Sequence, residues 1–497
     1  MSEKSPFPKC TPESAGIPSA AIEKYMRAVA GNDLYMHGLM IVRNGKCLYE
    51  TYWKPFDETF RHRLYSCSKS FVAVAVGLAI EQGYFTLESK CIDFFPEYLP
   101  EKVHPYLAQM TVRDLLRMAS CWTAGANYSP ADPDWIETFF TDEVSHVPGT
   151  VFNYCTSGTT MLCAIIRRTT GKDFMEVLRP VFDRIGVSED AFCVQAPMGK
   201  NGHFEWGGSG VVMTMRDFAK FANLCMHCGE HEGEYILPFE YMCEATSSQI
   251  DNSLHSGDMD TMLGYGYQFW MARHGGFAFY GMGGQYAICI PEKDLLVVTT
   301  GYEELQKTDR LEIFRALWRE VWPYISDEPL PEDPAAQKSL ADFSEGIVLP
   351  HAPGKTHSPM EKEIHKKLYI MNENPMGIKH MRFDFRGESV IWEYENATGE
   401  HALTIGLGQN VQQPFPERYC ATKIDQKADK GYNCFVSAGW TTEDTLGLHV
   451  HVADDYLGQL RMKICFKGDS VNLLGYKHAE WFMDEFVGNA TGHRKGE

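Results

Sequence analysis

Two kinds of hydrophobic pattern follow one another along the chain, and the first fills about two thirds of it. Apolar runs on both sides of Asn44-Gly45, the strongest two-residue hairpin signal, predict a β-hairpin over residues 36–53. Apolar stretches at 68–82 and 156–170 have the length of helices, and each is followed by a glycine. We further expect helices at 20–30, after Thr111 and Thr214, and at 308–322, and strands at 264–270, 277–280, 287–290 and 295–300.

The second pattern, beyond residue 360, consists of short segments in which apolar and polar residues alternate, as in strands with one buried face. Between the two patterns, residues 328–359 contain six prolines and many acidic or small residues, a composition typical of a linker. We therefore expect a first domain at 1–327, a linker at 328–359 and a β-rich accessory domain at 360–497. Its expected strands are 381–385, 389–394, 401–406, 446–452, 459–466 and 470–474.

Length and charge narrow the class of protein. At 497 residues the chain is too long for one ordinary core, which favours two domains. The net charge of −20 argues against a nucleic acid or an anionic membrane as a partner. The N-terminus lacks the apolar core of a secretory signal, and no run of about 18 apolar residues occurs. We expect a cytoplasmic protein with no membrane span.

The cysteines are expected to be reduced and mostly buried. Fifteen of them, an odd number, are scattered along the chain, as is typical of thiols in a reducing cytoplasm. Cys225 and Cys228 form a Cys-x-x-Cys pair near His227 and His231, but a zinc site needs four ligands and no second pair lies nearby. We expect packed thiols here rather than a metal or redox centre, and no cofactor for the protein.

The segment Tyr65-Ser66-Cys67-Ser68-Lys69 carries the first candidate chemistry, where an extended stretch passes into the apolar helix. Ser66 and Lys69 are three residues apart, which places them on one helix face about one turn apart. A serine hydroxyl is a weak nucleophile at neutral pH, and a neighbouring amine can take its proton. The helix N-terminus adds positive partial charge. Taken alone the spacing is weak evidence, because it also fits a plain helix start with a surface lysine.

Later segments supply the partners that such a nucleophile needs. Tyr154 stands just before the second apolar helix, and a tyrosine beside an ammonium group can relay a proton to a leaving group. In Gly281-Met282-Gly283-Gly284-Gln285, glycines let a backbone N–H approach a bound carbonyl closely. We assign the oxyanion hole to the N–H groups of Ser66 and Gln285.

The order of these motifs resembles that of the serine β-lactamase and penicillin-binding-protein superfamily, in its class C-like esterase branch. The resemblance covers about residues 10–325 and rests on Ser66-Cys67-Ser68-Lys69, Thr111 to Met118, Pro148-Gly149-Thr150-x-Phe152-x-Tyr154, Gly207-Gly208-Ser209-Gly210, Gly264-Tyr265-Gly266 and Gly281-Met282-Gly283-Gly284-Gln285.

The resemblance implies an α+β fold, in which an antiparallel sheet is flanked by helices and a mostly helical region is inserted. It also implies that Ser66 is the acyl-accepting nucleophile, that Lys69 is its base and that Tyr154 is the proton relay.

Two departures from the family pattern bear on the substrate. The motif that is usually Tyr-x-Asn is Tyr154-Cys155-Thr156, and the position that is usually Lys or His is Met282. In β-lactamases that cation and that asparagine help to bind the drug and its carboxylate, which a thioether cannot do. The departures therefore favour acyl transfer at Ser66 with an apolar substrate side and weaken β-lactam hydrolysis.

We interpret the chain as a serine hydrolase, most simply a carboxylesterase on a small or medium apolar ester. Transfer of the acyl group to an alcohol or amine is the same chemistry. The alternatives are an amidase, D-peptidase or β-lactamase of the same fold, and a non-catalytic binding protein on a hydrolase fold.

The substrate site is expected to include Thr156, Met282, Gly283 and Gly284. Aromatic residues near the motifs can also form its walls, although each one alone fits a core position equally well: Trp122, Tyr128, Trp135, Trp206 and Tyr267. The accessory domain shows no nucleophile–base arrangement. It can cover the site, form a homo-oligomer or only stabilise the protein, and a small-molecule substrate is the expected partner.

Overall fold

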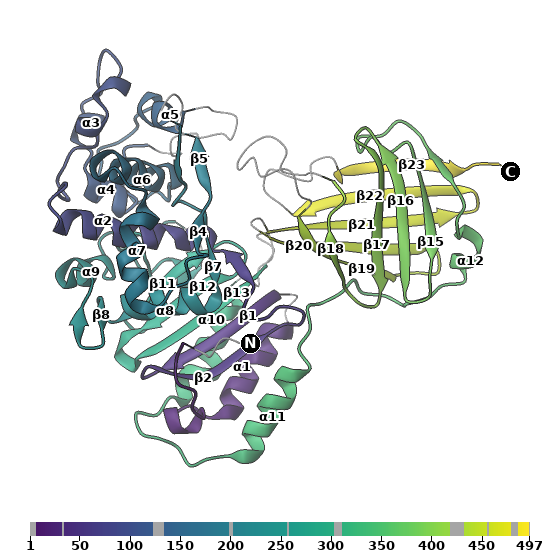
Figure 1. Ribbon diagram of the computed structural model, residues 1–497, viewed down its shortest axis with the longest axis horizontal. Coiled ribbons are helices and arrows are strands. Elements are labelled where there is room, and N and C mark those ends of the chain that lie inside the picture. Colours follow the sequence, from purple (N-terminus) through teal and green to yellow (C-terminus); the bar gives the residue numbers. More distant parts are fainter. Residues whose placement is uncertain are drawn as a thin grey trace. The chain divides into compact units, whose positions relative to one another are not determined.

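The structure is a computed structural model and describes residues 6–31, 34–122, 134–197, 202–255, 258–302, 311–417, 432–454, 457–478 and 486–496. The chain divides into two compact units, Met1–Val348 and Leu349–Glu497 (Figure 1). The expected boundaries at 327 and 360 stay a prediction. Within the expected linker the structure forms the helix α11, Pro334–Glu345, whose Leu340 is buried.

The first unit is built on a six-stranded antiparallel sheet with the strand order β10-β11-β12-β13-β1-β2. Its first two strands, β1 (Tyr35–Arg43) and β2 (Lys46–Tyr52), form the predicted hairpin. Asn44 and Gly45 join them with φ values of 50° and 66°, as a type I′ turn requires. The other strands are β10 (Trp270–Met271), β11 (Phe277–Gly281), β12 (Gln285–Ile290) and β13 (Leu295–Tyr302).

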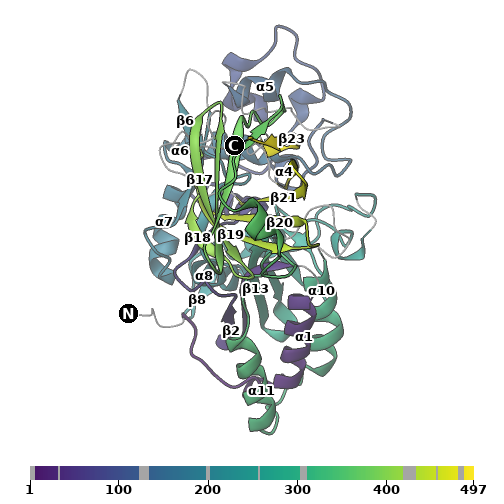
Figure 2. The ribbon, with the colours of Figure 1, turned by 90° about the vertical axis from the view of Figure 1, so that its right-hand side faces the viewer.

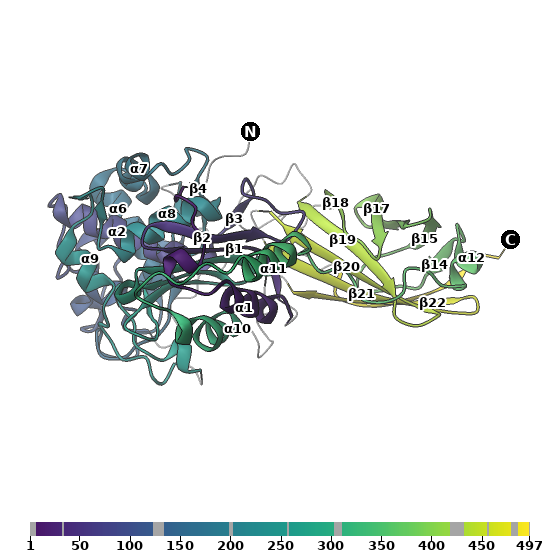
Figure 3. The ribbon, with the colours of Figure 1, turned by 90° about the horizontal axis from the view of Figure 1, so that it is seen from below.

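Helices cover both faces of this sheet. On one face lies α8 (Met215–Met226), since a side chain at Gly38 would touch Met215. The neighbouring Leu39 points to the opposite face, where it joins the core with residues of α1 (Ser19–Gly31). The period of two along a strand thus separates the two helical layers, and α10 (Glu312–Ala316) lies on the α1 side (Figure 3).

Between β2 and β10 the chain leaves the sheet and forms a mostly helical region (Figure 2). As predicted, Thr111 and Thr214 cap helices, and helices cover 68–81 and 156–170. The region contains, besides α8, the helices α2 (Ser68–Glu81), α3 (Cys91–Phe94), α4 (Val112–Leu116), α5 (Trp135–Thr141), α6 (Thr156–Thr170), α7 (Phe174–Ile185) and α9 (Phe239–Ala245). Its short strands are β3 (Arg61–Arg63), β4 (Phe192–Cys193), β5 (Gln195–Pro197), β6 (His203–Glu205), β7 (Val211–Thr214), β8 (Glu230–His231) and β9 (Glu234–Tyr235).

Two predicted elements are wrong in detail. The strand expected at 264–270 is irregular, because Gly264 and Gln268 have φ values of 110° and 63° that break the strand pleat. The helix expected at 308–322 is α10 followed by a π-helical turn over Leu317–Val321, and its first three residues lie outside the described ranges. None of the helices in the described part of the chain has both the length and the hydrophobicity needed to cross a membrane.

The second unit is a β-barrel. Its strand order is β17-β16-β15-β14-β23-β22-β21-β20-β19-β18, and a parallel pairing between β17 and β19 closes the sheet. Trp392, Leu448 and Ile464 are among the side chains that fill its core. The unit contains α12 (Met360–Ile364), β14 (Tyr369–Met371), β15 (His380–Phe385), β16 (Ser389–Asn396), β17 (Gly399–Leu407), β18 (Val411–Pro414), β19 (Asn433–Trp440), β20 (Thr445–Ala453), β21 (Leu457–Lys467), β22 (Ser470–His478) and β23 (Gly488–Arg494).

Candidate active site

A tight turn presents Ser66 at the start of α2. The short 3-10 helix Tyr65–Cys67 leads directly into α2, and Tyr65 has a φ of 50°. A tyrosine adopts this left-handed region only where its surroundings hold it, and Tyr65 is buried with the Arg63 guanidinium 4.8 Å from its ring centre. Ser66 itself is partly exposed, although Tyr65 and Cys67 on either side are buried. The turn thus directs one hydroxyl toward solvent from a buried segment.

Lys69 joins the candidate nucleophile to two other elements. Its Nζ donates to Ser66 Oγ at 3.0 Å and to the Gly208 carbonyl at 2.5 Å, and the side chain is 1% exposed. The same Nζ lies 5.1 Å from the ring centre of Tyr154. The structure therefore brings together the three residues expected to carry the chemistry.

The glycine-rich turn at 207–210 fits between α2 and α6. A Cβ on Gly207 would lie 2.2 Å from Val72 of α2, and one on Gly208 would lie 2.5 Å from the methyl group of Thr156. Only glycine lets the backbone pass this closely and carry the Gly208 carbonyl to Lys69. The sequence predicted the importance of this turn, but it did not predict the contact between Gly208 and Lys69. The close approach of Gly208 to Thr156 also places Thr156 beside Lys69, as the first residue of α6 after the N-cap Cys155.

The segment that leads to Tyr154 is held by backbone hydrogen bonds to the residues that follow α4. The Gly149 N–H donates to Ala119 O at 2.7 Å and the Asn153 N–H donates to Met118 O at 2.8 Å. The ring of Tyr154 packs on Trp270 with 5.2 Å between ring centres. Trp270 belongs to β10, so a strand that is distant from Tyr154 in sequence helps to orient its ring.

The expected oxyanion segment lies against the turn that carries Ser66. Gly281 and Gln285 pair across the loop that joins β11 to β12, and Gly283 and Gly284 have φ values of 81° and 87°. The Cys67 thiol donates to Gln285 O at 3.0 Å, next to Ser66. The Gln285 side chain is 0% exposed and donates to the carbonyls at positions 282 and 301, which fixes the start of β12.

Gly281 leaves no room for a side chain, since its Cβ would lie 2.3 Å from the Leu64 carbonyl. We expect Gly281→Ala to lower the free energy of unfolding by about 1–3 kcal/mol through overpacking. Gly31→Ala is the matched control, because a Cβ there meets nothing within 4 Å. Chemical denaturation of both variants tests this, and equal stability would contradict the tight contact.

The aromatic residues expected to line the site are in the core or outside the described residues. Trp122, Trp135, Trp206 and Tyr267 are at most 3% exposed, and Tyr128 lies outside the described ranges. Trp135 and Trp206 pack edge to face at 5.4 Å between ring centres. The Tyr267 hydroxyl donates to a Glu244 carboxylate oxygen at 2.5 Å and accepts from Arg113. Their expected role at the substrate stays a prediction, and this burial argues against it.

A different set of rings surrounds Tyr154. His255 lies 5.2 Å from Phe152 and 6.1 Å from Tyr154 between ring centres, and Trp270 packs against Tyr265 at 5.1 Å. His255 is exposed and about 100 residues distant from Tyr154 in sequence, so no local pattern connected them. We call the residues Phe152, Tyr154, His255, Tyr265, Trp270 and Tyr280 the ring cluster.

His62, which precedes Ser66 by four residues, packs against another histidine in the core. Its Nε2 lies 2.9 Å from His37 Nδ1, and both rings are buried. Burial lowers the pKa of His62 to about 3, so the ring is neutral near pH 7.

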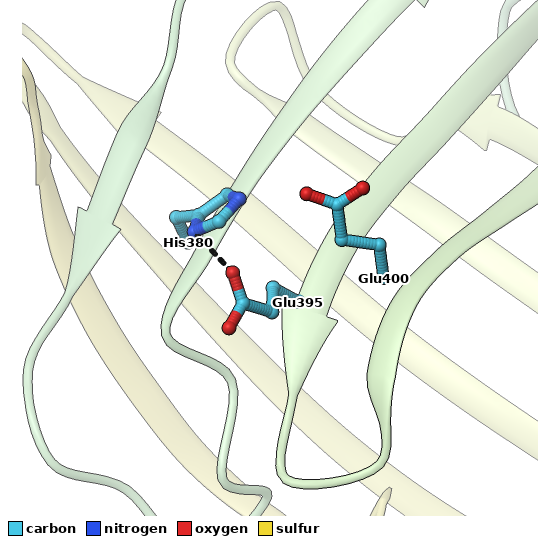
Figure 4. A group of neighbouring side chains, drawn as sticks. All are labelled: His380, Glu395 and Glu400. Carbon is cyan, nitrogen blue, oxygen red and sulfur yellow. Dashed lines mark ion pairs between the residues drawn. The ribbon is translucent and has the colours of Figure 1, made fainter.

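Among the described residues, one group has ligand atoms close enough together to hold a metal ion. His380, Glu395 and Glu400 stand side by side on three neighbouring strands of the barrel, with these atoms within 4.8 Å of one another (Figure 4). The Glu395 carboxylate already pairs with Lys379 at 2.7 Å and with His380 at 3.5 Å. These side chains balance its charge, so we assign no metal to this group.

A serine, a buried lysine and a tyrosine that meet beside a glycine-rich strand define a serine hydrolase of the Ser-x-x-Lys type. The comparisons agree: the sequence model of the beta-lactamase family matches residues 12–311, and the chain belongs to that family.

Individual proteins that this chain resembles have low sequence identity to it. The 6-aminohexanoate-dimer hydrolase of Paenarthrobacter ureafaciens is 23% identical over 321 residues, which cover 56% of this chain and 78% of that protein. A penicillin-binding protein homologue from Caulobacter crescentus shares the fold, with a TM-score of 0.50 and 13% identity over 63% of this chain and 98% of that one. The octameric penicillin-binding protein homologue of Pyrococcus abyssi matches 95% of this chain and 99% of its own, with a TM-score of 0.47 and 15% identity.

Proposed function

We propose that this serine hydrolase forms an acyl-enzyme on Ser66 and acts as a carboxylesterase on small or medium apolar esters. The observation that carries the proposal is the contact of Lys69 Nζ with Ser66 Oγ at 3.0 Å, with the Tyr154 ring 5.1 Å from the same nitrogen. A base within hydrogen-bond reach of a nucleophile, and a second proton carrier beside that base, are what acyl transfer needs.

In the proposed acylation step, Ser66 Oγ attacks the ester carbonyl carbon while its proton passes to the Lys69 amine. The N–H groups of Ser66 and Gln285 stabilise the charge that develops on the carbonyl oxygen. The bond to the leaving group then breaks, and Tyr154 gives the departing alkoxide a proton, which Lys69 replaces. A water molecule enters by the same steps in reverse and releases the acid.

The residues around this chemistry favour an apolar substrate. Met282, a thioether, stands where the family usually has a cation. It lies in the loop between β11 and β12, just before Gln285. The other members of the ring cluster border Tyr154, the residue that would meet the leaving group. Flat or extended apolar groups suit such surroundings better than a carboxylate does.

An amidase is the second candidate. It is favoured by the similarity to a hydrolase of a 6-aminohexanoate dimer, which is an amide. A panel of matched alkyl esters and alkyl amides with the same acyl group separates the two. Amide turnover equal to ester turnover would favour the amidase, and rapid nitrocefin hydrolysis would contradict the inference drawn from Met282.

The role of Tyr154 is tested with Tyr154→Phe, which keeps the ring packing on Trp270 and removes the hydroxyl. We expect turnover of an ethyl ester to fall by about 10²–10⁴. The acylation rate of a p-nitrophenyl ester, measured as its pre-steady-state burst, should suffer much less, because its leaving group departs without a proton. Tyr49→Phe, whose hydroxyl bonds Ser344, is the control. An equal loss in the acylation rate of both esters would contradict a relay to the leaving group.

A further inference from the structure

Two cysteines meet where the helix α9 packs beside the end of α8. The Sγ atoms of Cys228 and Cys243 are 3.0 Å apart, although the residues are 15 positions apart in sequence. A disulfide joins sulfurs at about 2.05 Å, so these two need to approach by only about 1 Å. Both are free thiols in this structure.

The backbone explains why Cys228, and not Cys225, finds this partner. Cys225 lies inside α8 and is fully buried. Cys228 follows the helix with a φ of 50°, the left-handed conformation that often ends a helix, and its N–H donates to the Cys225 carbonyl at 3.1 Å. The chain turns away from the helix axis there, and its thiol reaches Cys243 on α9.

Both residues are also partly exposed. Of the cysteines that the structure describes, Cys10, Cys228, Cys243 and Cys465 are partly exposed, and the others are buried. Burial of its thiol and the neighbouring Cys243 raise the pKa of Cys228 to about 12. A thiol in the protonated form is a poor nucleophile, so the reaction is expected to be faster at higher pH.

We propose that Cys228 and Cys243 are a reversible thiol–disulfide site that reacts with low-molecular-weight disulfides. In the first step the thiolate of one of the two cysteines attacks one sulfur of the small disulfide, forms a mixed disulfide and releases one small thiolate. The sulfur of the other cysteine then loses its proton, attacks the protein sulfur of the mixed disulfide and releases the second small thiolate. The two protein thiols are oxidised, and one small disulfide is reduced to two thiols.

The bond would tie α9 to the end of α8 behind the helix that carries the active-site lysine. Tyr241 of α9 donates its hydroxyl to the Ala73 carbonyl of α2 at 2.8 Å, and a Cβ on Gly77 would lie 2.5 Å from the Tyr241 ring. A crosslink that closes a loop of this length restricts the unfolded chain. The oxidised protein is therefore expected to melt a few degrees higher than the reduced protein.

The test uses the full chain, first reduced completely and then treated with oxidised glutathione. After the remaining thiols are alkylated under denaturing conditions, intact mass spectrometry should show a species that carries two fewer alkyl groups than the reduced and alkylated protein. Peptide mapping should link Cys228 to Cys243, and dithiothreitol should reverse both the link and the rise in melting temperature.

Single cysteine-to-serine variants test which two cysteines form the crosslink. Cys228→Ser and Cys243→Ser should each abolish the crosslink, whereas Cys10→Ser, another partly exposed cysteine, should leave it unchanged. Stable glutathione adducts on both residues without a crosslink would overturn the proposal. A crosslink that survives in Cys243→Ser, or the complete absence of oxidation, would overturn it as well.

Discussion

Ser66→Ala should abolish ester turnover, with a loss of about 10⁶-fold, the scale seen when a catalytic serine is removed from a serine protease. The substitution removes the hydroxyl that lies 3.0 Å from Lys69 Nζ, at the one partly exposed position between buried Tyr65 and Cys67. The variant should also fail to react with a fluorophosphonate probe that labels the wild-type chain.

Ser70→Ala is the matched control for this prediction. Ser70 is on the same helix and is buried, with its hydroxyl donated to the Gln268 carbonyl at 2.6 Å. Its loss should cost about 1 kcal/mol of stability and leave labelling intact. Labelling that persists in Ser66→Ala would show that another residue is the nucleophile. A wild-type chain that neither reacts with the probe nor turns over any ester or amide would support a binding protein instead.

The parts of the site that the sequence reveals are those encoded within a few residues. Ser66 and Lys69 are three positions apart on a helix, so their contact follows from helix geometry. The hairpin at Asn44-Gly45 follows in the same way from the positive φ that these two residues tolerate. The order of the later motifs then pointed to Tyr154, which the structure places beside Lys69.

The parts that the sequence did not reveal depend on contacts between distant segments. The Gly208 carbonyl reaches Lys69 across 139 positions, and nothing near either residue marks the contact. His255 packs its ring near Tyr154, with 6.1 Å between the ring centres, although the two are far apart in sequence. Conversely, residues such as Trp206 and Tyr267 were close to motifs in sequence, but the fold buries them in the core.

In the barrel, too, the strands that the sequence did not predict are those that depend on contacts with distant segments. β16 and β21 were predicted because apolar and polar residues alternate along them. β19 was missed, since seven of its eight residues are buried and its two faces carry no polar contrast. β23 is rich in glycine and polar residues that disfavour strands, and it owes its conformation to pairing with β14 and β22.

Replacing Lys69 with methionine is the second substitution from which we expect a large loss, about 10²–10⁴ in turnover. Methionine occupies a similar volume but can neither accept the Ser66 proton nor bond the Gly208 carbonyl. Stability should fall by only about 1–3 kcal/mol, the cost of leaving the buried Gly208 carbonyl without this hydrogen bond, which is too little to explain the loss of activity by unfolding. Ester kinetics and thermal melting of the same preparation measure the two effects separately.

A comparison with Lys69→Arg separates the proton transfer from the charge. Arginine keeps a cation at the site but does not accept a proton near neutral pH, and its fork is a poor fit for a position that is 1% exposed. It should therefore be as inactive as methionine if Lys69 is the base. Lys220→Met, which removes a lysine bound to Gly186 and Asp217 elsewhere in the unit, should retain activity. An active Lys69→Arg would mean that the positive charge near Ser66, and not a proton acceptor, is what the reaction requires.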